Sequence, residues 1–199
     1  MRYARATTTA ATIFATAVLA FIATAPARAT ETVAEPPDYR MDDFRSPVPA
    51  TLKGAKVVHI KEVEALWKSK GAAFIDVLPR PPKPKNLPAG TVWHDKVREN
   101  IPGSLWLANV GFGGLAPQMD AYFRDGLKKA TGGDLNRPVL FYCLSNCWMS
   151  WNAAKRALTY GYTHVLWFPD GSDGWAKAGL PVIKAEPEPL PDLPDAPPP

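Results

Sequence analysis

The chain has 199 residues and a net charge of +4, and hydrophobic residues make up 46% of it. Three of its 23 basic residues, Arg2, Arg5 and Arg28, lie in the first 29 positions, which hold no acidic residue, so the remainder has 20 basic and 19 acidic residues. This near-neutral remainder shows no basic stripe interleaved with aromatic residues, which excludes nucleic-acid binding as a function class.

The first 29 residues are organised like a secretory signal peptide. After the positive start, an apolar run extends from Thr8 to Ala23, and Ala27-Arg28-Ala29 places small residues before an expected cleavage after Ala29. The run is shorter and more polar than the roughly 20 mainly apolar residues of a membrane span. We therefore predict a periplasmic protein without a membrane span after cleavage; an uncleaved anchor is the alternative.

Short strands alternate with helices in the rest of the chain. Residues 30–51 are polar and proline-rich, which predicts an arm or linker outside the core. A single domain is predicted over 52–184, with strands at 56–60, 73–77, 104–108, 139–142 and 164–168 and helices at 61–70, 118–130, 150–160 and 172–178. This alternation indicates an α/β fold with a five-stranded, mostly parallel sheet and helices on both faces.

Two segments depart from this alternation. Residues 78–100 contain five prolines and five basic residues, which predicts an irregular basic insertion whose length indicates a function. Residues 185–199 are rich in proline and acidic residues, which predicts a disordered tail.

The predicted chemistry is centred on two cysteines. Cys143 directly follows the most apolar strand, and Cys147 lies four positions later, just before a helix. Loop amides and a helix N-terminus that converge at such a turn form an anion site, and they lower the pKa of a thiol placed there. Cys143 is the predicted nucleophile. Cys147 is a resolving thiol, a partner in a resting disulfide, or a bystander. The predicted anion-binding loop consists of Leu144, Ser145, Asn146, Trp148 and Met149.

Other residues have supporting roles in this prediction. Asp76, after the second strand's apolar run, is expected to bond loop backbone. Trp151 is expected in the core at helical spacing, and Trp148 is the candidate for an aromatic lid. The segment Asp170-Gly171-Ser172-Asp173-Gly174 predicts a turn in which Ser172 caps the last helix. No metal site is predicted.

The order of several segments resembles a rhodanese domain over about residues 52–183. The resemblance rests on Cys143 after its strand, Ala153-Ala154, Gly161-Tyr162, Asp170-Gly171, Trp175 and Gly179-Leu180-Pro181-Val182, with 74–77 and 101–104 in the N-terminal half. It implies a rhodanese-like fold. Rhodanese loops often hold a glycine and an arginine that this loop lacks. An anionic sulfur donor would therefore lack its usual cation unless Arg80, Lys83, Lys85 or Arg98 of the insertion folds over the site.

Residues 143–156 are similar to the hallmark segment of the PQQ-dependent catabolism-associated CXXCW motif proteins, although three residues separate the cysteines here. This resemblance implies a periplasmic protein that accompanies pyrroloquinoline-quinone alcohol dehydrogenases and their c-type cytochromes, without a bound cofactor of its own.

Three function classes follow from these observations. The first is an enzyme that acts on a small sulfur-containing or thiol substrate, by sulfur transfer through a Cys143 persulfide or by thiol–disulfide exchange. The second is a non-catalytic accessory module for a quinoprotein dehydrogenase or its cytochrome c. The third is a Cu(I)-binding protein, because soft thiolates suit Cu(I).

Overall fold

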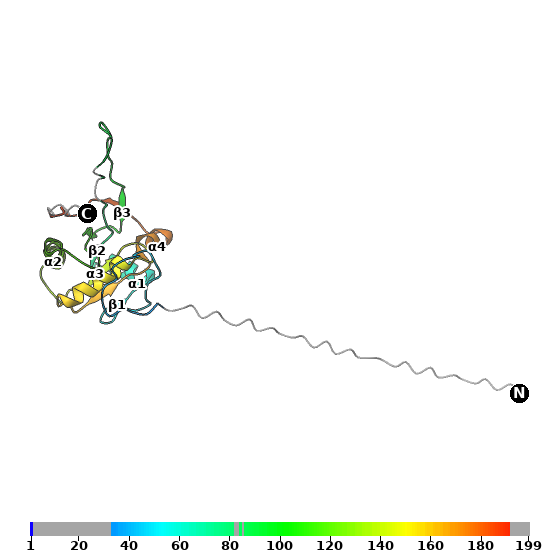
Figure 1. Ribbon diagram of the computed structural model, residues 1–199. Coiled ribbons are helices and arrows are strands. Elements are labelled where there is room, and N and C mark those ends of the chain that lie inside the picture. Colours follow the sequence, from blue (N-terminus) through cyan, green and yellow to red (C-terminus); the bar gives the residue numbers. More distant parts are fainter. Residues whose placement is uncertain (2–32, 82–83, 85, 192–199) are drawn as a thin grey trace. The chain divides into compact units, whose positions relative to one another are not determined.

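A parallel sheet of five strands forms the centre of this computed structural model, which describes Met1 and residues 33–81, 84 and 86–191 (Figure 1). The strands are β1 (Lys56–Val57), β2 (Ala73–Asp76), β4 (Leu105–Trp106), β5 (Val139–Tyr142) and β6 (Val165–Trp167), in the order β1-β6-β5-β2-β4. All four pairings are parallel, which confirms the predicted α/β class. The described residues between 33 and 191 belong to one compact unit, and the predicted signal peptide lies outside the described residues.

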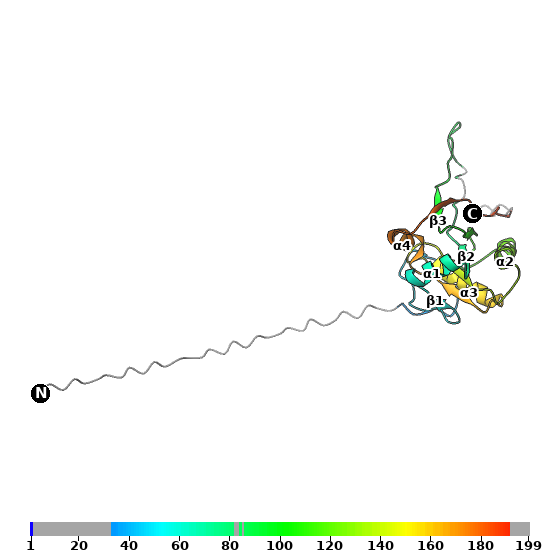
Figure 2. The same cartoon turned by 180° about the vertical axis from the view of Figure 1, so that it is seen from behind.

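Helices cover both faces of the sheet. The helices α1 (Ile60–Ser69) and α4 (Gly171–Lys177) lie on one side, and α2 (Pro117–Thr131) and α3 (Trp148–Thr159) lie on the other (Figures 1 and 2). Successive residues of a strand point to opposite faces. In β5, therefore, Phe141 packs with the α2 and α3 side chains, and Leu140 packs with those of α1 and α4. Both faces are buried, which explains the nearly continuous apolar sequence of β2 and β5.

The helix boundaries follow local sequence signals. Pro117 opens α2 at a position where a missing N–H costs nothing, and Gly132, with φ of 67°, ends it in the left-handed conformation. Lys70 ends α1 in the same conformation, with φ of 53°. None of the helices within the described residues combines the length and apolarity that a membrane crossing requires.

The end of the basic insertion is regular, which the sequence analysis did not predict. Its last residues form β3 (Arg98–Asn100), which pairs antiparallel with β7 (Ile183–Ala185) in a separate two-stranded sheet. The loop before β3 extends away from the main sheet (green in Figure 1). The prediction of an irregular segment over all of 78–100 is therefore wrong at its C-terminal end. The residues of β3 are all polar, so the strand shows no apolar alternation that could have identified it.

The first part of the predicted tail also packs on the domain. The Glu188 amide donates to the Trp106 carbonyl at the edge of β4 (2.9 Å), and the Tyr122 hydroxyl of α2 donates to the Glu188 carbonyl (3.1 Å). Leu190 contacts the core on the α2 and α3 side. The predicted disorder therefore does not describe residues 185–191, and residues 192–199 lie outside the described residues.

Residues 33–51, predicted as an arm outside the core, lie on the outer face of α3. The Asn152 side chain accepts a hydrogen bond from the Arg40 amide (2.9 Å) and donates to the Arg40 carbonyl (2.8 Å). Val33, Phe44 and Val48 contact the core. We call residues 33–51 the N-terminal cover. Its polar composition is compatible with packing because its backbone groups, rather than its side chains, make most of the polar contacts.

Candidate active site

The two cysteines lie where β5 turns into α3, at the carboxyl end of the sheet. Cys143 directly follows β5, which has β6 and β2 as its neighbours, and Cys147 is the N-cap of α3. Asn146 makes the turn with φ of 49°, in the left-handed region that asparagine tolerates better than most residues. The turn therefore places both sulfur atoms at the edge of the sheet where parallel α/β proteins bind ligands.

Cys143 and Cys147 form a disulfide with a Cα–Cα distance of 6.2 Å, within the usual range of about 4.4–6.8 Å. Of the three roles left open for Cys147, the structure thus shows the disulfide partner. Both residues are buried: Cys143 has no exposed surface, and Cys147 is 3% exposed. A reagent reaches the sulfur atoms only if the turn moves.

Asp173 of α4 binds the middle of this turn. The Ser145 amide and the Ser145 hydroxyl each donate to one oxygen of the Asp173 carboxylate, both at 2.6 Å. Partial burial opposes ionisation of this carboxyl group, but the hydrogen bonds from Ser145 and from the Asp173 and Gly174 amides together outweigh it and lower the pKa of Asp173. A protein carboxylate thus occupies donors that the sequence analysis assigned to an external anion.

A second amide of the predicted anion loop also has a partner within the protein. The Trp148 amide donates to the Phe44 carbonyl of the N-terminal cover (3.0 Å). Leu144 and Ser145 are partly buried, Asn146 is exposed, and Met149 is buried. The loop therefore has the predicted position, but two of its donors serve internal contacts.

The start of α4 holds the Cys143 carbonyl in place. The Ser172 amide (3.0 Å) and the Ser172 hydroxyl (3.2 Å) both donate to this oxygen. Gly171 has φ of 65° and passes so close to Leu144 that a Cβ atom would collide with the Leu144 backbone. Ser172 was expected to cap the last helix, but it makes no side-chain cap bond and contacts the cysteine turn instead.

A buried ion pair lies on the other side of the turn. Arg98 of β3 donates through Nε to Asp76 at the end of β2 (2.7 Å) and through Nη2 to the Cys143 carbonyl (3.4 Å). Asp76 also accepts from the Leu78 amide (3.0 Å), which is the backbone-bonding role predicted for it. Burial raises the pKa of Asp76, and the Arg98 guanidinium acts in the opposite direction.

The basic residues of the insertion thus differ in their relation to the site. Arg98 reaches the cysteine turn, as one of the hypotheses required. Arg80 pairs with Asp95, and its amide donates to the Asn109 side chain (2.9 Å), within the wall of a neighbouring cleft. Lys83 and Lys85 lie outside the described residues.

That cleft has a volume of about 790 Å³ and lies between the insertion, the cysteine turn and α4. Its wall includes Trp93, Val97, Trp106, Leu144 and Asp173. Because Leu144 directly follows Cys143, the cleft provides an approach to the turn. It is large and apolar enough for an organic thiol or a peptide segment.

The two tryptophans after Cys147 are both internal. Trp148 lies under the N-terminal cover, where its indole N–H donates to the Ser46 hydroxyl (3.0 Å) and to the Pro47 carbonyl (3.1 Å). The prediction of Trp148 as an aromatic lid is therefore wrong. Trp151 lies in the core, as its helical spacing predicts.

Sequence reasoning did not find Asp173 and Ser172 as part of the site. Their spacing in the sequence signals only a turn, and their proximity to Cys143 depends on how α4 packs. Among the described residues, no three histidine, cysteine or acidic side chains lie close enough to hold a metal ion.

Comparisons with known proteins give similar structures only, since no family model and no curated protein matches the sequence. A polysulfide-sulfur transferase homodimer from Wolinella succinogenes is similar over 65% of this chain and 79% of that chain, with 17% identity and a TM-score of 0.42. An uncharacterized protein from Saccharomyces cerevisiae is similar over 63% and 93% of the two chains, with 19% identity and a TM-score of 0.40. Fold and site together define an α/β protein with a buried disulfide at a strand-to-helix turn beside a cleft.

Proposed function

We propose that this protein is a rhodanese-like thiol–disulfide exchange protein, in which Cys143 and Cys147 alternate between a disulfide and a dithiol. The observation that carries this proposal is the disulfide itself, which joins the end of β5 to the N-cap of α3 at an edge of the sheet that adjoins a cleft. The rhodanese resemblance of the sequence supports a reactive cysteine at position 143.

The position of the two sulfur atoms suggests separate roles. A substrate thiolate attacks the Cys143 sulfur, and the Cys147 thiolate leaves at the N-terminus of α3, where the helix amides stabilise a negative charge. A second substrate thiol then attacks the mixed disulfide and releases the Cys143 thiol. In total, the protein disulfide gains two electrons and two protons, and two substrate thiols become one disulfide.

Sulfur transfer fits the same turn less well. A thiosulfate ion needs hydrogen-bond donors and a cation, but Ser145 already donates to Asp173, and Asp76 neutralises the Arg98 guanidinium. A rhodanese-type persulfide on Cys143 would require both internal contacts to open.

A second candidate function is a non-catalytic accessory module, favoured by the burial of both cysteines. Its surface for a partner would be the cleft and the insertion beside it. The association with a PQQ-dependent dehydrogenase or its cytochrome c, and the periplasmic location, stay proposals that rest on the sequence resemblance and the predicted signal peptide. A disulfide persists more readily in such an oxidising compartment.

The intact mass of the protein tests these alternatives. We expect the isolated protein to be about 2 Da lighter than the reduced protein, and we expect reoxidation by a small disulfide to pass through an adduct that Cys147→Ser traps on Cys143. A gain of about 32 Da on the reduced protein with thiosulfate, lost in Cys143→Ser, would instead establish persulfide chemistry. A protein whose disulfide resists reduction while folded would support the accessory module.

A further inference from the structure

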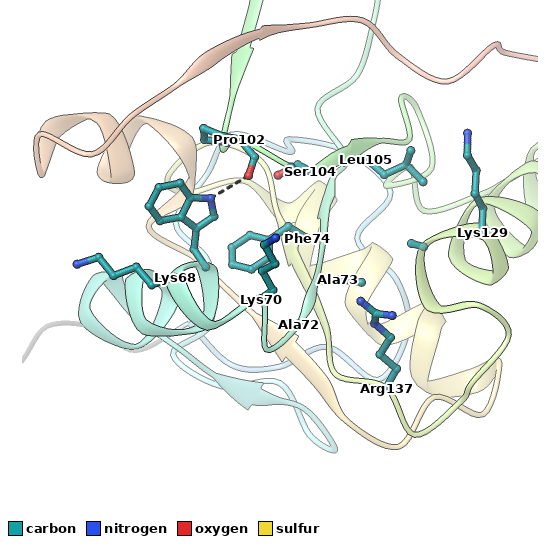
Figure 3. A pocket seen from close by; sticks show the side chains of 13 residues that line it. Lys68, Lys70, Ala72, Ala73, Phe74, Pro102, Ser104, Leu105, Lys129 and Arg137 are labelled. Atoms are coloured by element: carbon teal, nitrogen blue, oxygen red, sulfur yellow. Dashed lines mark hydrogen bonds between the residues drawn. The ribbon is translucent and has the colours of Figure 1, made fainter.

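A second pocket lies at the opposite end of the sheet from the cysteines, at the amino ends of β2 and β4. It has a volume of about 850 Å³ and opens between α1 and α2 (Figure 3). Its floor is mainly apolar and includes Ala73, Phe74 and Leu105. One wall is fixed by Trp67 of α1, whose indole N–H donates to the Pro102 carbonyl (2.9 Å). We call this pocket the α1–α2 groove.

Four basic side chains surround the α1–α2 groove. Lys68 and Lys70 lie on the α1 side, and Lys129 and Arg137 lie on the α2 side (Figure 3). Lys68 pairs with Glu64, and Lys129 pairs with Glu188, each at 2.6 Å. Within residues 33–81, 84 and 86–191, no carboxylate lies within ion-pair distance of Lys70 or Arg137. The groove thus combines an apolar floor with two cations that attract carboxylates.

The C-terminal segment of the same chain reaches the rim of this groove. The Glu188 side chain pairs there with Lys129 (2.6 Å), and its amide donates to the Trp106 carbonyl of β4, outside the groove lining (2.9 Å). The described chain stops three residues later, at Pro191. Residues 192–199 have a reach of at most about 26 Å when extended.

The sequence beyond Glu188 has a pattern that matches the groove. Residues 190–195 repeat the triplet Leu-Pro-Asp, and the first leucine, Leu190, already contacts the core. A proline-rich segment favours the polyproline II helix, which has about three residues per turn. Such a helix would place Leu193 on one side and both Asp192 and Asp195 on another.

We propose that residues 192–199 bind in the α1–α2 groove of their own chain. Leu193 packs on the floor beside Leu105, and Asp192 and Asp195 pair with Lys70 and Arg137. The segment then covers the outer edge of β4, which is the last strand of the sheet and has only two residues. Covering an edge strand prevents it from pairing with another chain.

Carbodiimide cross-linking of the full-length protein tests this proposal, because the reagent joins only carboxylates and amines that are in contact. We expect peptides that link Asp192 or Asp195 to Lys70. The pairs Glu64–Lys68 and Glu188–Lys129 are internal positive controls. If the control links form and no link joins Asp192 or Asp195 to a lysine of the groove, the proposal is wrong.

An equal mixture of isotope-labelled and unlabelled protein identifies the chain that supplies the segment. Links within single-label chains support the proposal, whereas mixed-label links would show that the groove binds a second copy and would overturn it. Arg137→Gln should lower the yield of the Lys70 links about threefold, in keeping with the loss of one exposed ion pair. Lys61→Gln, on α1 but outside the groove, should leave the yield unchanged.

Discussion

Asp173 is the internal anion of the cysteine turn. Its carboxylate binds the amide and the hydroxyl of Ser145, which sits two residues after Cys143. Hydrogen bonds to a charged group are each worth about 1.5–3 kcal/mol. Asp173 is exposed to solvent, which weakens these bonds, but an external anion must still displace an internal one.

Replacing Asp173 should open the turn to anions. We expect reduced Asp173→Ala to form a persulfide with thiosulfate at least about tenfold faster than the reduced wild-type protein, because two donors become available and one negative charge is lost. Mass spectrometry of timed samples measures the rate. Asp134→Ala, an exposed aspartate remote from the turn, serves as the control. Equal rates in Asp173→Ala and the wild type would show that Ser145 does not contribute to an anion site.

The Asp76–Arg98 pair should support stability as well as the position of the turn. Removal of one partner from a buried ion pair costs about 3–5 kcal/mol, because the other charge is left buried. We expect Arg98→Met to lower the free energy of unfolding by about 3 kcal/mol in urea titrations. Adding Asp76→Asn to Arg98→Met should recover most of this loss. A loss below about 1 kcal/mol in the single variant would indicate that water solvates Asp76.

Among the elements, α3 holds the N-terminal cover through several side chains, of which Asn152 makes the most buried contacts. Asn152 is buried and bonds to the amide and carbonyl of Arg40 and also to the Gly111 carbonyl. We expect Asn152→Ala to cost about 2–3 kcal/mol, since three backbone groups lose their partner.

The same variant should loosen the cover itself. Because Trp148 is held by Phe44, Ser46 and Pro47, a loosened cover should accelerate both proteolysis within residues 33–51 and reduction of the disulfide. Timed proteolysis and thiol titration measure these rates. Asn136→Ala, an exposed position outside the interface, should change neither of them.

The contact between Asp120 of α2 and Tyr160 at the end of α3 should make the free energy of unfolding depend on pH. Burial opposes ionisation of Asp120, but hydrogen bonds from Tyr160 and Arg124 outweigh it and lower the pKa of Asp120 in the folded state. A lowered folded-state pKa stabilises the protein above the unfolded-state pKa, and the gain is lost as the pH falls through the folded-state value.

The size of this pH effect is limited because the Asp120 side chain is 37% exposed. We expect Asp120→Asn to lower stability by about 0.5 kcal/mol at neutral pH and to have no effect well below pH 4. Urea unfolding at several pH values measures the difference. A penalty that persists at acidic pH would assign the effect to packing rather than to charge.

The elements with strong apolar patterns could be predicted from the sequence. The four helices and five strands of the main domain occur where the periodicity indicated them, with shifts at their ends. The strands β3 and β7 could not be predicted, because neither has a buried apolar run and their pairing joins residues as distant in the sequence as Arg98 and Ala185. In the site, the position of Cys143 and Cys147 could be predicted, because the sequence shows a strand, a short loop and a helix around them. The contact with Asp173 could not be predicted, because it depends on how α4 packs.

The sheet and its two helical layers should remain folded without the disulfide. The bond closes a loop of only a few residues, which corresponds to about 2 kcal/mol in the chain-entropy model. We expect reduction to lower the melting temperature by about 4–8 °C and to leave a folded dithiol protein.

Thermal scans of the oxidised protein, the reduced protein and the Cys143→Ala/Cys147→Ala double variant test this expectation. Exchange chemistry needs both redox states to be folded. Unfolding of the reduced protein at moderate temperature would make the bond a structural staple and would contradict the proposed function.

The N-terminal cover also has a consequence for biosynthesis. Its contacts join residues more than a hundred positions apart: 112 between Arg40 and Asn152, and 118 between Pro37 and Lys155. A ribosome makes residues 33–51 early, but their binding surface on α3 emerges much later. The nascent chain therefore carries Phe44 and Val48 without a partner until most of the domain has been synthesised. The cover is made before its binding surface and is among the last segments to reach its place, so an interrupted chain that lacks α3 leaves these apolar residues open to chaperones and proteases.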